Sequence, residues 1–256
     1  MILTDTHTHL YSEQFDEDID NVISVCLEKG IDRMFLPNID SSSIAGMIEL
    51  GNKYPKNCFP MMGLHPTSVT ANYIEELAIV EDWLNKHEFC AVGEIGIDLY
   101  WDKSFLKEQQ DAFRYQINLA KNNDLPFVIH CRDSFDEIFE ILDELNDDKM
   151  RGIFHCFTGD IEQANHIINY GDFKIGIGGV VTFKNAGLDK TVAQIGLEHI
   201  VLETDSPYLA PVPFRGKRNQ SPYLYLIAEK VADIYQLSIE EIAKITTENS
   251  KKVFGF

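Results

Sequence analysis

Short apolar segments alternate with longer amphipathic segments along almost the whole chain, and this alternation restricts the possible folds more than any other feature. Eight segments have the length and composition of strands: Ile2–Thr6, Arg33–Asn38, Phe59–Gly63, Cys90–Ile95, Phe127–His130, Gly152–His155, Lys174–Ile177 and Ile200–Glu203. Several are continuously apolar, as in parallel strands that are covered on both faces. Clear helical patterns lie between them: Asp16–Lys29, Ile74–His87, Leu106–Asn122, Phe135–Leu145 and Ile161–Asn169.

The order of these segments predicts one architecture. A long polar loop and two further helical segments, Tyr223–Tyr235 and Ile239–Val253, follow the last strand, and Ser238 with Glu241 forms a capping box for the second helix. About eight βα units in a chain of 256 residues match a (β/α)8 TIM barrel. We therefore expect an α/β fold, a TIM barrel that forms a single domain over residues 1–256. A doubly wound open sheet is the competing fold, but no Gly-rich phosphate loop follows the first strand to support it.

The charge of the chain limits how it can bind a polyanion. It has 22 Lys and Arg against 41 Asp and Glu, a formal net charge of −19, which repels polyanions at long range. A phosphate substrate must therefore be held by metal ions or by a local basic cluster. Five cysteines without a CxxC spacing indicate reduced thiols and a cytoplasmic protein. The N-terminus is not a signal peptide, no stretch approaches the ~18 apolar residues of a membrane span, and a monomer is the default expectation.

Polar side chains gather where the predicted strands end, and five of the eight histidines lie at such positions. Barrel enzymes place their catalytic groups there because the C-terminal strand ends converge on one pocket. The segments are DTHTH (5–9), GLHP (63–66), GEIGID (93–98), HCR (130–132), HCFTG (155–159) and ETDSP (203–207). The other histidines, His87, His166 and His199, are expected at the surface.

Six of these side chains predict a metal site. His7 and His9 are two residues apart, so they share one face of a strand, although an HxH pair alone is a weak signal. Taken singly, each of the others has an ordinary interpretation as a hydrogen-bonded core residue, but an unpaired buried carboxylate is costly. A shared site satisfies all six at once: His7, His9, Glu94, His130, His155 and Asp205.

Six ligands exceed those of one tetrahedral ion, so we expect two divalent ions with one carboxylate between them. Mixed imidazole and carboxylate ligands suit Zn²⁺, Mn²⁺, Ni²⁺ or Fe²⁺, and a more hydrated site suits Mg²⁺. Two such ions lower the pKa of a water between them and hold both oxygens of a phosphoryl displacement.

These motifs together match a known family. The chain resembles the TatD-type metal-dependent deoxyribonucleases, a branch of the amidohydrolase-like barrel enzymes. The matching segments run from Thr4 to Gly255: DTHTHL, GLHP, GEIGIDLYWD, HCR, HCFTG, GIGGVVTFKNAG, ETDSPYLAPVPFRGKRN and TTENSKKVFG. DTHTH is common to many metallohydrolases, whereas GEIGIDLYWD together with ETDSPYLAPVPFRGKRN is highly specific.

The resemblance implies a role for each site residue. The first ion is bound by His7, His9 and Asp205, the second by His130 and His155, and Glu94 bridges the two. Asp205 would also orient or deprotonate the attacking water. Glu203 is a candidate to support a ligand or transfer a proton, or it is only an acid at a strand end. His65 would contact substrate phosphate rather than serve as a primary ligand, unless it is merely ordered by Pro66.

The resemblance also implies the reaction, which is hydrolysis of phosphodiesters in DNA, by a 3′–5′ exodeoxyribonuclease that acts on single strands or 3′ ends. Four cations are expected to bind phosphate near the pocket: Arg132, Arg215, Lys217 and Arg218. The last three lie in the loop Phe214–Asn219, which is otherwise an ordinary solvated loop. Tyr100, Trp101 and Tyr208 are placed either to stack on bases or simply to pack in the core or at the rim.

One segment departs from the family. Where the family has RGKRNEP, this chain continues with Gln220, Ser221 and Pro222. The change leaves the expected ligands untouched and puts in doubt the substrate preference carried by this loop. Ser221 and Pro222 still predict the N-cap and first position of the next helix.

Three other functions compete. An amidohydrolase-like hydrolase of a small ester, amide or phosphate often uses a carbamylated lysine as its metal bridge, and this chain has Glu94 instead. A trinuclear-metal phosphoesterase requires further His and Asp ligands. A binding protein with a relict site is disfavoured because all six expected ligands are present.

Overall fold

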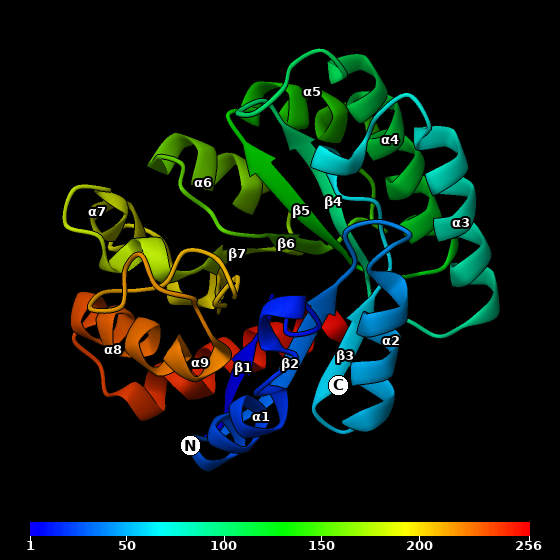
Figure 1. Ribbon diagram of the computed structural model, residues 1–256. Helices are drawn as coiled ribbons and strands as arrows, with labels where there is room; N and C mark the ends of the chain where they lie inside the picture. Colours follow the sequence, from blue (N-terminus) through cyan, green and yellow to red (C-terminus); the bar gives the residue numbers. More distant parts are fainter.

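The computed structural model describes residues 1–256 and consists of parallel strands surrounded by helices (Figure 1). The eight strands are β1 Leu3–Asp5, β2 Ile31–Pro37, β3 Cys58–Met61, β4 Val92–Asp98, β5 Phe127–Arg132, β6 Gly152–Phe154, β7 Phe173–Ile177 and β8 Ile200–Leu202. Each overlaps the segment that the sequence predicts for it. Every strand pair is parallel, so the α/β barrel prediction is confirmed and the open-sheet alternative is wrong.

The barrel is built from two runs of paired strands, β1-β2-β3 and β4-β5-β6-β7-β8. Two isolated parallel bridges join the runs: Met62 pairs with Val92, and Thr8 pairs with Ser206. The second bridge connects the residues that follow β1 to those that follow β8. The two ends of the chain of strands therefore meet beside the predicted metal ligands.

Nine helices cover the strands: α1 Ile19–Glu28, α2 Ile44–Lys53, α3 Tyr73–Lys86, α4 Leu106–Asn122, α5 Phe135–Leu145, α6 Ile161–Asn169, α7 Leu188–Val192, α8 Leu224–Tyr235 and α9 Ile239–Phe254. The capping box of α9 is confirmed. α1 begins at Ile19, later than predicted, because residues 16–18 form a turn after the 3₁₀ helix Glu13–Phe15. α2 has buried residues on one face, but two glycines lie among them and weaken its helical pattern.

Two further expectations are wrong. Ser221 does not cap the next helix, because Ser221–Tyr223 forms a 3₁₀ turn and α8 begins at Leu224. The Ser221 hydroxyl is buried and instead donates to Oγ1 of Thr8, 3.1 Å away. Of the three histidines expected at the surface, His87 is exposed, but His166 and His199 are half-buried.

The apolar core leaves only one end of the barrel for polar chemistry. A main cluster of 57 buried residues lies largely between helices and strands. A smaller cluster takes Val128, Ile153 and Val201 from the second position of their strands together with Val253 from the end of α9, and Phe254 stacks on Phe35 with ring centroids 3.9 Å apart. This packing fills the N-terminal side of the barrel. No helix is both long enough and apolar enough to cross a membrane.

Candidate metal centre

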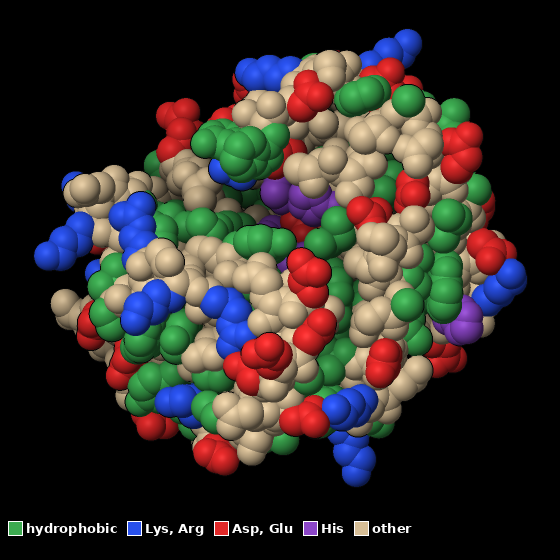
Figure 2. Space-filling model, in the orientation of Figure 1, with side chains coloured by type: hydrophobic (Ala, Val, Ile, Leu, Met, Phe, Trp, Pro, Cys, Tyr) green, Lys and Arg blue, Asp and Glu red, His purple; other side chains and the backbone are tan.

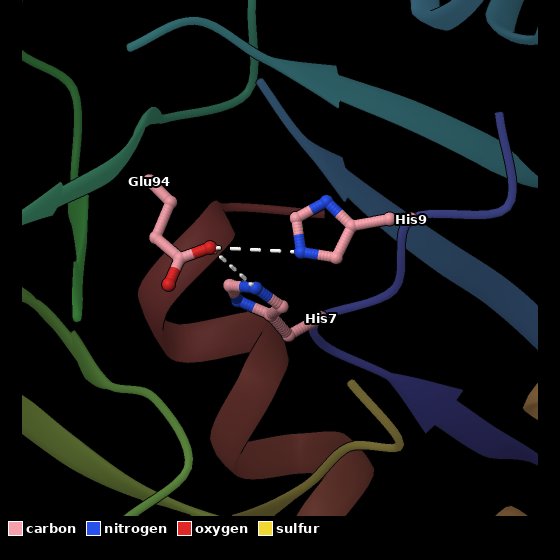
Figure 3. A group of neighbouring side chains, drawn as sticks. All are labelled: His7, His9 and Glu94. Carbon is pink, nitrogen blue, oxygen red and sulfur yellow. Dashed lines mark hydrogen bonds and ion pairs between the residues drawn. The ribbon is translucent and has the colours of Figure 1, made fainter. Parts of the chain in front are cut away.

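One carboxylate, that of Glu94, lies at the centre of the site. Glu94 is on β4, a strand in which every residue is buried, while His7 and His9 belong to the backbone that follows β1. Both imidazoles point at the same carboxylate oxygen (Figure 3): Oε2 is 3.0 Å from Nε2 of His7 and 3.6 Å from Nε2 of His9. The HxH pair thus forms one side of the site.

The other oxygen of Glu94 faces a second group of imidazoles. Oε1 lies 2.8 Å from Nδ1 of His130, 3.3 Å from Nε2 of His65 and 3.6 Å from Nε2 of His155. His130 is on β5, and His155 directly follows β6. The two oxygens of one carboxylate therefore face two separate sets of imidazole nitrogens, an arrangement that suits a carboxylate bridging two ions through its two oxygens.

Asp205 lies against both groups. Its Oδ1 is 3.7 Å from Nε2 of His9, 4.0 Å from Nε2 of His7 and 3.8 Å from Nε2 of His155. The backbone of Asp205 has φ of 56°, a left-handed conformation that is uncommon for a residue with a side chain. Hydrogen bonds hold it there: its N–H donates to the carbonyl of His7, and its carbonyl accepts from Tyr208. Such strain is typical of functional positions.

The donor atoms fit metal ions. Ligands at ~2.1 Å from one ion lie about 3.0–3.4 Å from each other in octahedral or tetrahedral geometry, and the contacts around Glu94 run from 2.8 to 3.6 Å. The contacts to Asp205 are slightly longer, 3.7 to 4.0 Å. The group His7–His9–Glu94 has its donor atoms within reach of one ion, and Oε1 of Glu94 with Nδ1 of His130 offers donor atoms for a second.

His65 turns a protonated ring nitrogen towards Glu94. It precedes the 3₁₀ turn Pro66–Ser68, and its Nδ1 accepts a hydrogen bond from the backbone N–H of Thr67 at 3.1 Å. In a neutral ring Nε2 then carries the proton. The nitrogen that faces Glu94 is therefore a hydrogen-bond donor and not a free metal ligand.

Glu203 lies behind His155 rather than in the open part of the site. It is fully buried, its Oε1 is 2.9 Å from Nδ1 of His155, and the same oxygen accepts from the backbone N–H of Cys156. Gly176 makes room for it, because a Cβ there would lie 2.3 Å from Oε2. The sequence suggested that Glu203 either supports a metal ligand or transfers a proton. Its position behind His155 favours the first of these roles.

Asp98 plays the same part for His130, and the sequence reasoning missed it. Its Oδ2 lies 2.9 Å from Nε2 of His130, and its other oxygen accepts from the backbone N–H of Tyr100 at 3.0 Å. Gln109 of α4 bonds both the N–H and the carbonyl of Asp98. A proton on Nε2 leaves Nδ1 of His130 free as a ligand. Asp98 is the last residue of the motif GEIGID (93–98), which also contains Glu94. This shared motif was the only feature of the sequence that could have pointed to Asp98.

Glycine at position 96 allows this arrangement. Gly96 pairs with His130 in the β4–β5 register and has φ of 144°, and a Cβ there would lie 2.0 Å from the carbonyl oxygen of His130. A side chain would therefore push the two strands apart at the position where Glu94 and His130 meet.

The charges of the site are mutually dependent. Burial raises the pKa of Asp205 to about 7, an effect that His155 opposes and that the nearby Glu94 and Glu203 reinforce. Burial also acts to raise the pKa of Glu94, but His7, His65 and His155 outweigh it and hold that pKa well below its usual range. A cation bound beside Asp205 would lower its pKa, so cation binding and protonation compete at this carboxylate.

The four basic residues expected to bind substrate fall into two groups. Arg218 is used by the fold: its guanidinium donates to both carboxylate oxygens of Asp18 and lies 4.5 Å from the ring of Phe15. Arg218 is therefore paired with an acid that is distant in the sequence, and its contact with substrate stays a prediction. Arg132, Arg215 and Lys217 are exposed and have no carboxylate partner.

Comparisons with known proteins agree with one another. A model of the TatD related DNase family matches residues 4–255. The chain is 39% identical over 254 residues to the uncharacterized metal-dependent hydrolase YabD of Bacillus subtilis, covering 99% of each protein. It is 31% identical to the uncharacterized metal-dependent hydrolase YcfH of Escherichia coli K12, covering 99% of this chain and 96% of that one.

A solved structure shows the same relationship in three dimensions. The crystal structure of YJJV, a TatD homolog from Escherichia coli K12, matches with a TM-score of 0.93 at 26% identity, covering 99% of this chain and 98% of that chain. All of these matches extend over nearly the whole chain and include every residue of the site described above.

Proposed function

The chain belongs to the TatD related DNase family and is a metal-dependent hydrolase, and from this we propose that it cleaves phosphodiester bonds in DNA as a 3′–5′ exodeoxyribonuclease. The observation that carries the proposal is the position of Glu94, whose two oxygens face different sets of imidazoles. This geometry supports a pair of ions, which is the arrangement used to displace a phosphoryl group in line.

We assign the ligands accordingly. His7, His9 and Asp205 would hold one ion, and Nδ1 of His130 with Nε2 of His155 the other, with Glu94 shared between them. When bound, the two ions would supply the charge that lowers the pKa of a water and stabilises the phosphoryl oxygens. The imidazole-rich donor set favours Zn²⁺, Mn²⁺ or Ni²⁺ over Mg²⁺.

The protein groups contribute positioning and proton transfer. Asp205 lies between the two imidazole groups, so we assign it to orient the attacking water and to accept its proton. His65 presents the N–H of Nε2 to the site, where it would donate to a phosphate oxygen. Glu203 and Asp98 act through the histidines that they contact, because a hydrogen bond to the far nitrogen of an imidazole fixes its orientation.

The rim supplies the positive charge that the composition lacks. Arg132, Arg215 and Lys217 are exposed and unpaired in a chain whose net charge is −19, and guanidinium groups suit bidentate contacts to phosphate. We propose that DNA, as a single strand or a 3′ end, is the partner that these residues bind. The five cysteines are all unpaired, which supports a reducing compartment such as the cytoplasm, and we propose that the protein works as a monomer.

The test compares substrates and metal content in one experiment. Protein as isolated, chelator-treated protein and Asp205→Ala are incubated with 5′-labelled single-stranded DNA, and with a panel of small amides and esters. We expect ladders shortened from the 3′ end, abolished by chelator and restored by added Mn²⁺, with Asp205→Ala slower by on the order of 10³-fold while its circular dichroism is unchanged. Full DNase activity in the metal-stripped protein contradicts the proposal, and turnover of an amide alone favours the small-molecule alternative.

A further inference from the structure

Three aromatic side chains stand out of the surface around the candidate metal centre. Trp101 is 73% exposed, Tyr100 53% and Tyr208 49%, although large aromatic side chains usually bury most of their surface. Figure 2 shows hydrophobic side chains beside the hollow in which histidine atoms are visible. This exposed surface contributes nothing to the core and is free to contact a ligand beside the metal centre.

Each aromatic residue lies close to the metal centre, either through Asp98 or through a direct ring contact. Asp98, which contacts His130, accepts a hydrogen bond from the backbone N–H of Tyr100, and Trp101 follows. On the opposite side, the ring of Tyr208 lies 5.9 Å from the ring of His9. The aromatics therefore flank the place where the scissile phosphate would lie.

Arg132 joins the first pair into one unit. It ends β5 opposite Asp98, its guanidinium carbon is 3.7 Å from the Tyr100 ring centroid and 5.5 Å from that of Trp101, and the two rings meet edge to face at 4.8 Å. Arg132 makes no ion pair, so its charge is available. A flat apolar face next to an unpaired cation matches a nucleotide, which joins a flat base to an anionic phosphate.

We infer that Tyr100, Trp101 and Arg132 form a subsite for one unpaired nucleobase of the strand being cut, with Arg132 on the adjoining phosphate and Tyr208 on the far side. The inference rests on the proposed function and specifies its substrate as an unstacked, single-stranded end. A base within a duplex has both faces covered by its neighbours, so it reaches the Trp101 ring only after unstacking.

The chain offers its own reporter for this contact. It has two tryptophans, and the other, Trp83, lies in α3, half-buried against His87. The Trp83→Phe variant leaves Trp101 as the sole source of tryptophan fluorescence. Metal-loaded Trp83→Phe protein is titrated with phosphorothioate-linked (dT)6, which resists cleavage, with an abasic strand of the same length and charge, and with a blunt duplex.

We expect (dT)6 to quench Trp101 fluorescence to saturation, and the abasic strand and the duplex to leave it unchanged. With unmodified DNA, Trp101→Ala should raise KM about tenfold with kcat nearly unchanged, Trp101→Phe should restore most of the loss, and Trp83→Phe should behave like the parent.

Equal quenching by the abasic strand, or an unchanged KM in Trp101→Ala, overturns the subsite while leaving the nuclease proposal intact. Base-dependent quenching without DNA cleavage in any divalent metal overturns the nuclease proposal and leaves the subsite standing.

Discussion

The floor of the site and its rim are built by different means. On the floor, Glu94 and the imidazoles around it project from strands or from the residues directly after them, and their neighbours are fixed by strand register. The cations that we propose for the rim, Arg215 and Lys217, lie in a long loop after β8, and their surroundings depend on how that loop packs. The floor therefore follows from the topology, whereas the rim depends on contacts that the topology does not determine.

Replacing the bridging carboxylate should have the largest effect. Glu94→Gln keeps the size of the side chain but removes the charge that faces both imidazole groups, so we expect kcat to fall on the order of 10³-fold. The protein should also retain fewer metal ions per chain, measured by mass spectrometry of the dialysed protein. If Glu94→Gln kept activity within tenfold of the parent, Glu94 could not be the carboxylate that bridges the two ions.

Asp98→Asn tests whether the carboxylate behind His130 contributes to metal binding. The amide preserves the shape but not the charge that orients His130, and loss of such a contact weakens metal affinity about 10–100-fold. Titration should show one of the two ions bound more weakly and the other unchanged. The control is Asp102→Asn, an exposed acid four residues on that bonds only Ser104. Equal metal affinities in Asp98→Asn and Asp102→Asn would show that Asp98 does not contribute to metal binding.

Substitutions of Arg215 and Arg218, which are three residues apart, distinguish a residue that binds DNA from one that stabilises the fold. Arg215 has no acidic partner, so Arg215→Ala should raise KM for single-stranded DNA by about 5–10-fold and lower the slope of log KM against log salt by about 0.7. Arg218→Ala should leave both nearly unchanged, because Asp18 already occupies its guanidinium. Steady-state kinetics at several salt concentrations measures both quantities. An equal change of KM in the two variants would show that both arginines of the loop bind DNA.

The smallest effect concerns stability. Hydrogen bonds from Arg218 lower the pKa of Asp18, with a small opposing effect of burial. A carboxyl whose pKa is lower in the folded state stabilises the protein above its unfolded pKa of ~3.9, and this contribution is lost as pH falls through the folded pKa. Arg218→Ala should therefore cost at most about 1 kcal/mol at pH 7 and less at about pH 3, below the unfolded pKa of ~3.9. Urea unfolding at both pH values measures the difference, and a cost independent of pH would contradict the ion pair.

These contrasts also explain what the sequence can predict. The eight strands and the grouping of His7, Glu94 and Asp205 follow from apolar segments ending in polar residues, because barrel strands converge at one end. Asp98 was missed because its contact with His130 exists only after β4 and β5 pair. Arg218 resembled its neighbours in the loop until Asp18, distant in sequence but close in space, was placed beside it.

The aromatic rim shows the same limit. The sequence left Tyr100, Trp101 and Tyr208 equally placed to stack on bases or to pack. In the structure all three side chains are largely exposed, which weakens the packing alternative, and the sequence could not predict this because exposure depends on where the loops lie. A helical or strand pattern records which face is buried, but a loop has no such period.

The most direct test of the two-ion site is anomalous diffraction from crystals grown with Mn²⁺ or Zn²⁺. We predict two peaks about 3.5–4 Å apart, one beside His7 and His9 and the other beside His130 and His155, with the Glu94 carboxylate between them. A single peak, or three, would contradict this account of the site.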